Sequence, residues 1–266
     1  MGQTRETPGR GRRPTQTTNC TIRAQLRSFR SPHRIPGRVR ARFASVASTL
    51  LTARFATTVA RLAQLPDEAG VAEVAVVGRS NAGKSSAINA LCRKRRLAFA
   101  SKTPGRTQAL NYFALGPAAG PPQAYLVDTP GYGFATAPIE IRRAWDQLAG
   151  RYLARRHALA GVVLVLDIRR GLTDLDRGLL AWMRPEVPLL VLLTKADKFG
   201  QAQQAAAMRD TEADLRALRM ANPVALLSFS ATRRIGLDEA REFIDAWLSA
   251  HRSTDGPPPD GPATGR

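Results

Sequence analysis

The sequence has few of the residues that build disulfides or metal sites. It holds two cysteines, Cys20 and Cys92, and three histidines, all far apart along the chain. Two isolated cysteines argue against a disulfide framework and against a cysteine-based zinc site. No apolar run approaches the roughly 18–20 residues that a membrane-spanning helix needs. The N-terminus also lacks the apolar segment of a secretory signal, so we expect a cytoplasmic protein without a membrane contact.

Acidic residues are scarce relative to basic ones. The 266 residues carry 40 Lys and Arg against 21 Asp and Glu, for a formal net charge of +19. Residues 1–62 hold thirteen Arg and a single acid, Glu6, so +12 of the +19 lies there. Residues 63–266 hold 27 basic and 20 acidic residues, or +7. Such a charge favours nucleic acid or another anionic partner and carries no information about the fold.

Both ends of the chain are poor in apolar periodicity. Residues 1–47 are rich in Arg, Thr, Ser, Pro and Gly, and we expect a disordered basic extension. Four interpretations of it stay open: a solvated tail, a mis-assigned start upstream of Val46 or Leu50, an organelle transit peptide, and an RNA-binding arm. Residues 252–266 are rich in Pro and Gly and predict a disordered tail. Residues 48–251 then form the folded domain.

Two kinds of apolar segment alternate between these ends. Nearly continuous apolar runs predict strands at Glu73–Val77, Leu110–Leu115, Ala124–Val127, Val162–Ile168, Leu189–Leu193 and Val224–Phe229. Helices are predicted at Lys84–Arg93, Pro138–Arg156, Thr173–Met183, Gln201–Met220 and Leu237–Ser249, with a short amphipathic helix within Ser48–Leu65. The alternation predicts an α/β fold, with a six-stranded, mostly parallel sheet and helices on both faces. Ligands of such folds bind at the carboxyl ends of the strands.

One loop between a strand and a helix carries a phosphate-binding motif. The pattern G-x-x-x-x-G-K-[ST] is matched in full by Gly78, Arg79, Ser80, Asn81, Ala82, Gly83, Lys84 and Ser85. The glycines let the backbone approach phosphate oxygens, and successive N–H groups then point at the negative charge. Lys84 reaches the β- and γ-phosphates, and the Ser85 hydroxyl binds Mg²⁺. The motif predicts a P-loop NTPase and does not choose between ATP and GTP.

A second motif is typical of recognition of the nucleotide base. Thr194, Lys195, Ala196 and Asp197 follow an apolar strand and match the [NT]-K-x-D pattern of GTPases. The Asp197 carboxylate can accept hydrogen bonds from N1–H and the exocyclic amine of guanine. Adenine lacks this donor pair and would leave the charge unpaired, at a cost of a few kcal/mol. The Lys195 stem can lie along the base, and the turn Phe229, Ser230, Ala231 can present an N–H to guanine O6.

Further residues are predicted around the γ-phosphate. Asp128, Thr129, Pro130 and Gly131 match D-x-x-G; Asp128 would hold Mg²⁺ through water, and the Gly131 N–H would meet the phosphate. The intervening segment contains Gly105, Arg106, Thr107, Gln108 and Ala109. Thr107 is the favoured second hydroxyl ligand of Mg²⁺ because it lies just before a strand, and Thr103 is the alternative.

Two residues bear on the rate of hydrolysis. Tyr132 follows Gly131 at the position where a glutamine would orient the attacking water, so slow intrinsic hydrolysis is predicted. Asn81 is a candidate to hold K⁺ beside the phosphates, and its alternative role is to stabilise the loop. Lys84 and Asn81 are therefore the predicted catalytic residues.

The strings GRSNAGKSS, SKTPGRTQALNYF, DTPGYG, TKAD and FSA together resemble the EngB (YihA) family, a branch of the Era-like (TrmE-Era-EngA-EngB) GTP-binding proteins. The resemblance covers about residues 55–250. It implies a GTPase that assists assembly of the large ribosomal subunit and is linked to cell division and septation. It also implies GTP contacts at the five motifs and Mg²⁺ ligands at Ser85 and Thr107. The expected partners of this monomer are GTP or GDP and a large-subunit precursor or its rRNA.

Other functions stay open. A P-loop ATPase or kinase would share the phosphate motif, and a non-enzymatic RNA-binding protein could be led by the basic tail. Two groups of basic residues suit either an RNA partner or an ordinary solvated surface. They are the run Arg93–Arg96 with Lys102, and the arginines Arg142, Arg143, Arg151, Arg155 and Arg156 of one predicted helix.

Overall fold

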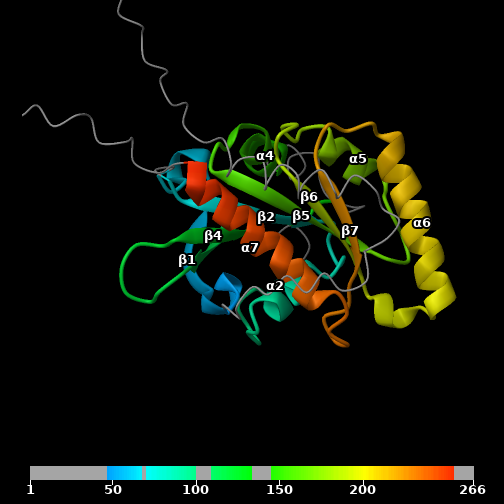
Figure 1. Cartoon of the computed structure of the whole chain (residues 1–266). Coiled ribbons are helices and arrows are strands. Elements are labelled where there is room, and N and C mark those ends of the chain that lie inside the picture. Colours follow the sequence, from blue (N-terminus) through cyan, green and yellow to red (C-terminus); the bar gives the residue numbers. More distant parts are fainter. Residues whose placement is uncertain (1–46, 68–69, 100–108, 134–144, 255–266) are drawn as a thin grey trace, which may run out of the picture. The chain divides into compact units, whose positions relative to one another are not determined.

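A seven-stranded sheet forms the centre of the domain (Figure 1), in the order β1-β3-β4-β2-β5-β6-β7. The computed structural model describes residues 47–67, 70–99, 109–133 and 145–254. Strands β4, β2, β5, β6 and β7 pair in parallel, and β3 is antiparallel to both β1 and β4. The strands span Arg54–Val59, Ala72–Gly78, Leu110–Leu115, Ala124–Asp128, Leu159–Asp167, Leu189–Thr194 and Val224–Ser228. The predicted α/β class with a mostly parallel sheet is confirmed, with one strand more than expected.

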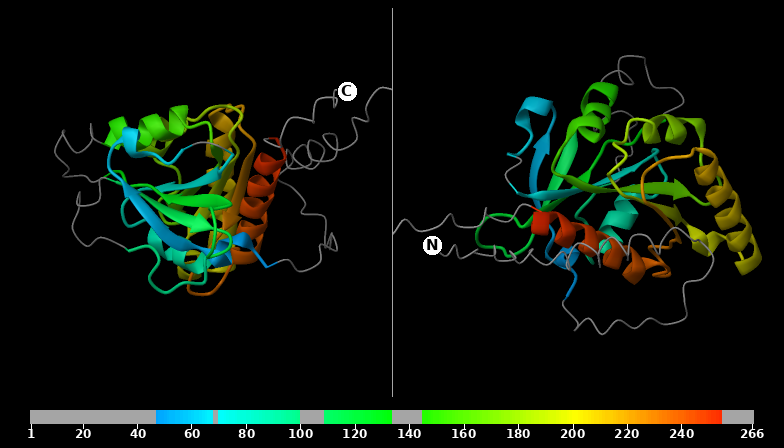
Figure 2. Two further views of the ribbon diagram at one scale, coloured as in Figure 1. Left: turned by 90° about the vertical axis from the view of Figure 1, so that its left-hand side faces the viewer. Right: turned by 45° about the horizontal axis from the view of Figure 1, so that its top comes forward.

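Helices cover both faces of this sheet (Figure 2). On one face, α4, α5 and α6 bury side chains such as Tyr152, Leu179 and Leu215 against the strands. On the other face, α2 and α7 bury side chains such as Ile88 and Leu248. The central strands β2 and β6 are buried along their whole length, which explains their continuous apolar sequences. The helices span Lys84–Leu91, Arg151–Arg155, Asp174–Leu180, Gln201–Ala217 and Leu237–Thr254.

The predicted amphipathic helix in Ser48–Leu65 is wrong. That segment contains a 3-10 turn at Thr49–Thr52, strand β1, and a second 3-10 turn at Leu62–Gln64. Strand β1 pairs with β3 at the edge of the sheet, with a bulge between Phe55 and Thr57. Leu50 and Val59 are fully buried, as an amphipathic segment requires, but Phe55 is 59% exposed. Backbone pairing with a strand about fifty residues away decides this conformation, and the local apolar spacing does not reveal it.

A buried polar cluster lies at the amino end of β2. Glu73 is fully buried and accepts hydrogen bonds from the hydroxyls of Tyr112 (3.2 Å) and Tyr152 (2.8 Å). Its other oxygen pairs with the Arg156 guanidinium at 2.7 Å, which also donates to the Pro66 carbonyl. Arg156 is therefore neither a solvated helix residue nor available to an RNA partner, which corrects the expectation from sequence. Burying Glu73 is tolerated because its charge is paired and hydrogen-bonded.

Candidate functional site

The predicted phosphate loop connects β2 to α2 and follows the backbone that its glycines permit. Gly78 lies so close to β5 that an added Cβ would come 2.6 Å from the Val165 carbonyl oxygen. Gly83 has a φ of 101°, and an added Cβ would lie 3.4 Å from the Thr194 hydroxyl. No side chain caps the start of α2, so the first N–H groups of this helix are open to a ligand. Such an uncapped helix start, reached by a glycine-rich loop, suits a phosphate group.

The segment after β4 lies directly against this loop. The Lys84 ammonium is ion-paired with the Asp128 carboxylate, and both side chains are nearly buried. Thr129 fixes the start of the segment, because its N–H and its hydroxyl both donate to the Val76 carbonyl, at 3.2 and 3.0 Å. Gly131 is so close to Ser80 that an added Cβ would lie 3.2 Å from the Ser80 nitrogen. The structure thus brings both phosphate-side motifs together at the carboxyl ends of β2 and β4.

The loop after β6 is tied to the phosphate loop. The Thr194 hydroxyl lies 2.5 Å from the Ala82 carbonyl oxygen and 2.9 Å from that of Leu166. Lys195 has a left-handed backbone (φ 61°), and its ammonium donates to the Asn81 carbonyl at 2.8 Å. Two residues separated by more than a hundred positions from the phosphate loop therefore hold its backbone. The motif T-K-x-D has a structural function here as well as its predicted role at the base.

Asp197 is oriented by the turn that follows β7. The Ser230 hydroxyl donates to Asp197 Oδ1 at 2.6 Å, and this hydrogen bond holds the pKa of Asp197 below its usual range. The backbone agrees, since the Ala196 N–H donates to the Phe229 carbonyl at 3.1 Å. Gly236 closes the same turn, because an added Cβ would meet the Ser228 carbonyl oxygen at 2.2 Å. The predicted base residues of β6 and β7 thus lie together, with an ionised carboxylate between them.

Sequence reasoning missed Asp167, which ends β5 beside the phosphate loop. This nearly buried carboxylate accepts from Lys195 at 2.8 Å and from two guanidinium nitrogens of Arg169, at 2.9 and 2.6 Å. Burial raises the pKa of Asp167, but the hydrogen bonds from Arg169 and Lys195 outweigh it and lower the pKa well below its usual range. The available signal was an acid at the carboxyl end of a buried strand, which is where such folds bind ligands.

Tyr132 does not face the phosphate loop with its hydroxyl. The side chain is 8% exposed, and its hydroxyl donates to Asp176 Oδ1 of α5 at 2.6 Å. Burial and the Asp176 carboxylate raise the pKa of Tyr132, so it stays protonated. Trp145 packs edge-on against the ring, stacks on Trp182, and donates its indole N–H to the Pro130 carbonyl at 2.7 Å. This anchoring of the D-x-x-G segment to α5 was not predicted from sequence.

Several predicted residues lie outside the described residues and stay predictions. They are Gly105, Arg106, Thr107, Gln108, the rival Thr103, and the basic residues Lys102, Arg142 and Arg143. Ala109 is described and is half-buried just before β3.

The residues present fit a magnesium ion that is bound together with a nucleotide. The described residues contain no group of three or more His, Cys, Asp or Glu that could hold a metal by itself. Mg²⁺ commonly takes only one or two protein ligands and completes its shell with phosphate oxygens and water. Ser85, in the first turn of α2, and Asp128, across from Lys84, supply oxygens of that kind. In the same described ranges, no helix combines the length and apolarity needed to cross a bilayer.

Comparisons with known proteins agree with this geometry. A family described as "50S ribosome-binding GTPase" matches residues 73–195. A relative from Paraburkholderia phymatum described as "Probable GTP-binding protein EngB" is 50% identical over 214 residues, or 79% of this chain and 95% of that protein. A protein of the same description from Burkholderia cenocepacia is 50% identical over 207 residues, or 76% of this chain and 94% of that protein.

The fold also matches solved structures. The crystal structure of Aquifex aeolicus Era bound to GDP.AlF4- aligns with a TM-score of 0.51 at 22% identity, over 67% of this chain and 57% of that chain. Fold, loop geometry and sequence together define a P-loop GTPase. Within that class, the chain belongs to the EngB family of GTP-binding proteins.

Proposed function

We propose that this chain is a magnesium-dependent GTPase switch that acts in assembly of the large ribosomal subunit and supports normal cell division and septation. The observation that carries the proposal is the hydrogen-bonded connection from the phosphate loop to the base loop. The Ala82 carbonyl accepts a hydrogen bond from the Thr194 hydroxyl, and the Asn81 carbonyl accepts one from the Lys195 ammonium. The Asp197 carboxylate accepts one from the Ser230 hydroxyl. The same loop that would hold phosphates is thereby fixed relative to a carboxylate suited to guanine.

The base would be selected by Asp197. Its carboxylate is ionised and oriented by Ser230, while 17% of the side chain remains exposed to receive a ligand. Guanine would donate two hydrogen bonds to it, and adenine would leave the charge without donors. This favours GTP over the alternative of a P-loop ATPase or kinase. Lys195 would lie along the base, with its ammonium held by Asn81 and Asp167.

The triphosphate would be bound at the start of α2. Lys84 would exchange its Asp128 partner for the β- and γ-phosphates, and Asp128 would then hold a water of the Mg²⁺ shell. Ser85 and Thr107 would supply the hydroxyl ligands of Mg²⁺. This ion, when bound, would neutralise charge that develops on the phosphates. The Gly131 N–H, close to Ser80, is the backbone donor proposed for the γ-phosphate.

Hydrolysis is proposed to be slow without help. The hydroxyl of Tyr132 is occupied by Asp176, so no side chain at this position orients a water. Within the described residues, the exposed side chain of Asn81 makes no hydrogen bond, so its amide oxygen is available to a K⁺ ion. Its backbone is left-handed (φ 63°), a conformation that asparagine tolerates, so the loop-stabilising role stays the alternative. We expect faster turnover in KCl than in NaCl, and no such difference after Asn81→Ala. Equal rates of the unmodified protein in the two salts would contradict a K⁺ site.

Binding to ribosomal particles tests the switch itself. The protein would be sedimented with bacterial ribosomal subunits in GDP or in a non-hydrolysable GTP analogue. We expect the protein to bind the large subunit or its precursor in one nucleotide state. We further propose that it acts as a monomer in the cytoplasm. Binding that ignores the nucleotide would remove the switch.

The ends of the chain enter the same experiment. Residues 1–47 are proposed to be an extension outside the GTPase domain that starts at residue 48. The predicted C-terminal boundary at residue 251 is corrected, because α7 continues to Thr254, and the C-terminal extension is proposed to begin after that residue. Deleting residues 1–45 should keep nucleotide-dependent binding. Loss of all binding would instead favour a non-enzymatic RNA-binding protein led by its basic tail.

A further inference from the structure

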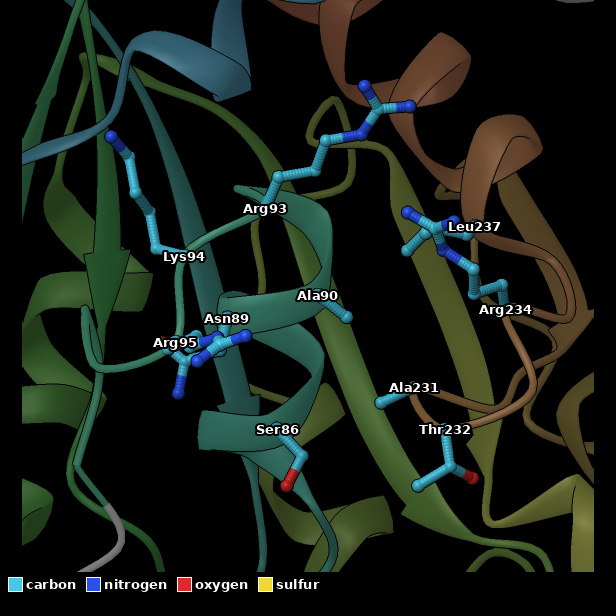
Figure 3. A pocket seen from close by; sticks show the side chains of 10 residues that line it. All are labelled: Ser86, Asn89, Ala90, Arg93, Lys94, Arg95, Ala231, Thr232, Arg234 and Leu237. Atoms are coloured by element: carbon cyan, nitrogen blue, oxygen red, sulfur yellow. The ribbon is translucent and has the colours of Figure 1, made fainter.

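A basic cleft of about 400 Å³ lies between α2 and the segment that leads into α7 (Figure 3). Ser86 and Ala231 line one end, and they adjoin the phosphate loop and the Ser230 turn described above. The other part is lined by Arg93, Lys94 and Arg95, which follow α2, and by Arg234 on the facing segment. The cleft therefore begins beside the candidate nucleotide site and continues away from it along α2.

The four basic side chains have no acidic counterpart. All four residues are exposed, and none takes part in the ion pairs formed among the described residues. Three basic residues of the candidate site, Lys84, Lys195 and Arg169, are ion-paired.

Arg93 and Arg234 flank the cleft, and the side chains of Lys94 and Arg95 lie on the side of α2 away from Arg234 (Figure 3). Four like charges close to the end of α2 raise the positive potential there and attract polyanions. The four positive charges repel one another, and a partner that carries several phosphates would offset this repulsion.

The walls of the cleft are fixed by hydrogen bonds. The Asn89 side chain accepts from the N–H groups of Leu97 and Ala98, both at 2.9 Å, and donates to the Ala98 carbonyl at 2.8 Å. The basic run is thereby held at both ends, since the Lys94 N–H donates to the Asn89 carbonyl. The buried Arg241 of α7 donates to the Ala90 and Leu91 carbonyls, both at 2.9 Å. These bonds tie α2 to α7, so the charges lie on a preformed surface.

We propose that this cleft binds the phosphodiester backbone of ribosomal RNA. The inference rests on the proposed function, because it names the surface that contacts the partner. The favoured ligand is RNA rather than an acidic protein because Phe99, directly after the anchored Ala98, is 73% exposed and offers a ring for base stacking. The cleft extends from Ser86, in the first turn of α2, to the basic residues that follow this helix. RNA bound in the cleft would therefore contact α2, which begins at Lys84.

The test neutralises three of these charges in the full-length chain. The variant is Arg93→Gln, Arg95→Gln, Arg234→Gln, and the probe is purified large-subunit ribosomal RNA. The matched control is Arg209→Gln, Arg216→Gln, Arg219→Gln, which removes the same charge from exposed positions in and just after α6, on the opposite face of the sheet. Arg219 has a left-handed backbone like Arg93 and Arg234, so both variants place glutamine in that conformation. All proteins are saturated with GDP and Mg²⁺.

The readout is the dependence of RNA affinity on salt. The slope of log K against log salt is negative, and each lost phosphate contact reduces its magnitude by about 0.7–0.9. The magnitude of the slope should therefore be smaller by about 2–3 for the cleft variant. Its affinity should fall about tenfold or more at physiological salt, while the control keeps the slope of the unmodified protein. GDP affinity should be unchanged in both variants. Equal slopes for cleft variant and unmodified protein would overturn the proposal.

Two further arms separate the possible failures. Tripolyphosphate, added to the GDP-loaded protein, should bind more weakly than RNA. Tight binding of this small anion, with no binding of RNA, would make the cleft a site for small anions and would overturn the proposal. Sedimentation with ribosomal subunits tests the parent function independently. Nucleotide-dependent binding that is retained by the cleft variant would leave the switch intact and remove only the RNA cleft. Absence of subunit binding by the unmodified protein would remove the switch itself.

Discussion

The two halves of the candidate site are built differently. In the base half, Thr194, Lys195 and Asp197 are each held by a hydrogen bond from or to a residue of another element. In the phosphate half, ligand contacts would come from the uncapped start of α2 and from Lys84, which is engaged with Asp128. The base half is therefore held together by contacts within the chain. In the proposed function, the phosphate half exchanges an ion pair when the nucleotide binds, so we expect this half to respond to the nucleotide.

The largest expected effect breaks the base half. Asp197→Ala removes an acceptor of two hydrogen bonds to a charged group, each worth about 1.5–3 kcal/mol. GTP affinity should fall about 10²–10⁴-fold, while the weak affinity for ATP stays unchanged. Calorimetric titration of both nucleotides measures the two values. A parallel loss for GTP and ATP would show that Asp197 supports the fold of the loop and does not read the base.

Lys84→Ala breaks the phosphate half and leaves the base half intact. The turnover number for GTP should fall about 10²–10³-fold, the usual cost of losing one charge-stabilising group at a reacting centre. The ratio of GDP to ADP affinity should stay as in the unmodified protein, because Asp197 still reads the base. Single-turnover hydrolysis and titration with the diphosphates check these outcomes. A changed base preference would mean that the halves are not separable.

Asp167→Asn tests whether the base half depends on the ion pair between Asp167 and Lys195. Lys195 would keep the Asn81 carbonyl and lose its ion pair, and about a tenfold loss of GTP affinity is expected. In the unmodified protein, the low pKa of Asp167 keeps the carboxylate ionised at every pH above its ordinary value of 3.8. Its contribution to stability is therefore fully present at neutral pH and is lost only as the pH falls through the lowered pKa. GTP titrations of both proteins between pH 8 and pH 5 should give parallel curves; a loss confined to the mildly acidic range would contradict this assignment.

The smallest expected effect on nucleotide binding concerns the anchor of the phosphate half. Tyr132→Phe removes the hydroxyl that donates to Oδ1 of the buried Asp176, whose other oxygen still accepts from the Thr173 N–H and hydroxyl. The free energy of unfolding should fall by about 1.5–3 kcal/mol, because this hydrogen bond ends on a carboxylate, and GTP affinity should stay the same. Urea denaturation measures the first and titration the second. A marked rise in hydrolysis would be the contrary result, since it would assign the hydroxyl an inhibitory role at the phosphates.

Sequence reasoning succeeded where the local structure depends on neighbours in the chain. Gly78–Ser85 lies between a strand and a helix as predicted, because a glycine-rich turn and an apolar strand are local properties. It failed where a distant strand decides the outcome. Ser48–Leu65 has helical apolar spacing, yet β1 gains its backbone hydrogen bonds from β3. Arg156 looked like part of a basic surface, and only the fold shows that Glu73 buries it.

The same contrast holds within the site. By itself, the sequence determined the phosphate loop, the T-K-x-D loop and the mostly parallel sheet, because each is encoded in a short run of residues with a fixed chemistry. Only the tertiary structure decided that Thr194 and Lys195 hold the phosphate loop, that Asp167 supports Lys195, and that Tyr132 faces α5. Those contacts join residues far apart in the chain, and hydrogen bonds of that kind form only after the parallel strands bring their carboxyl ends to one edge of the sheet.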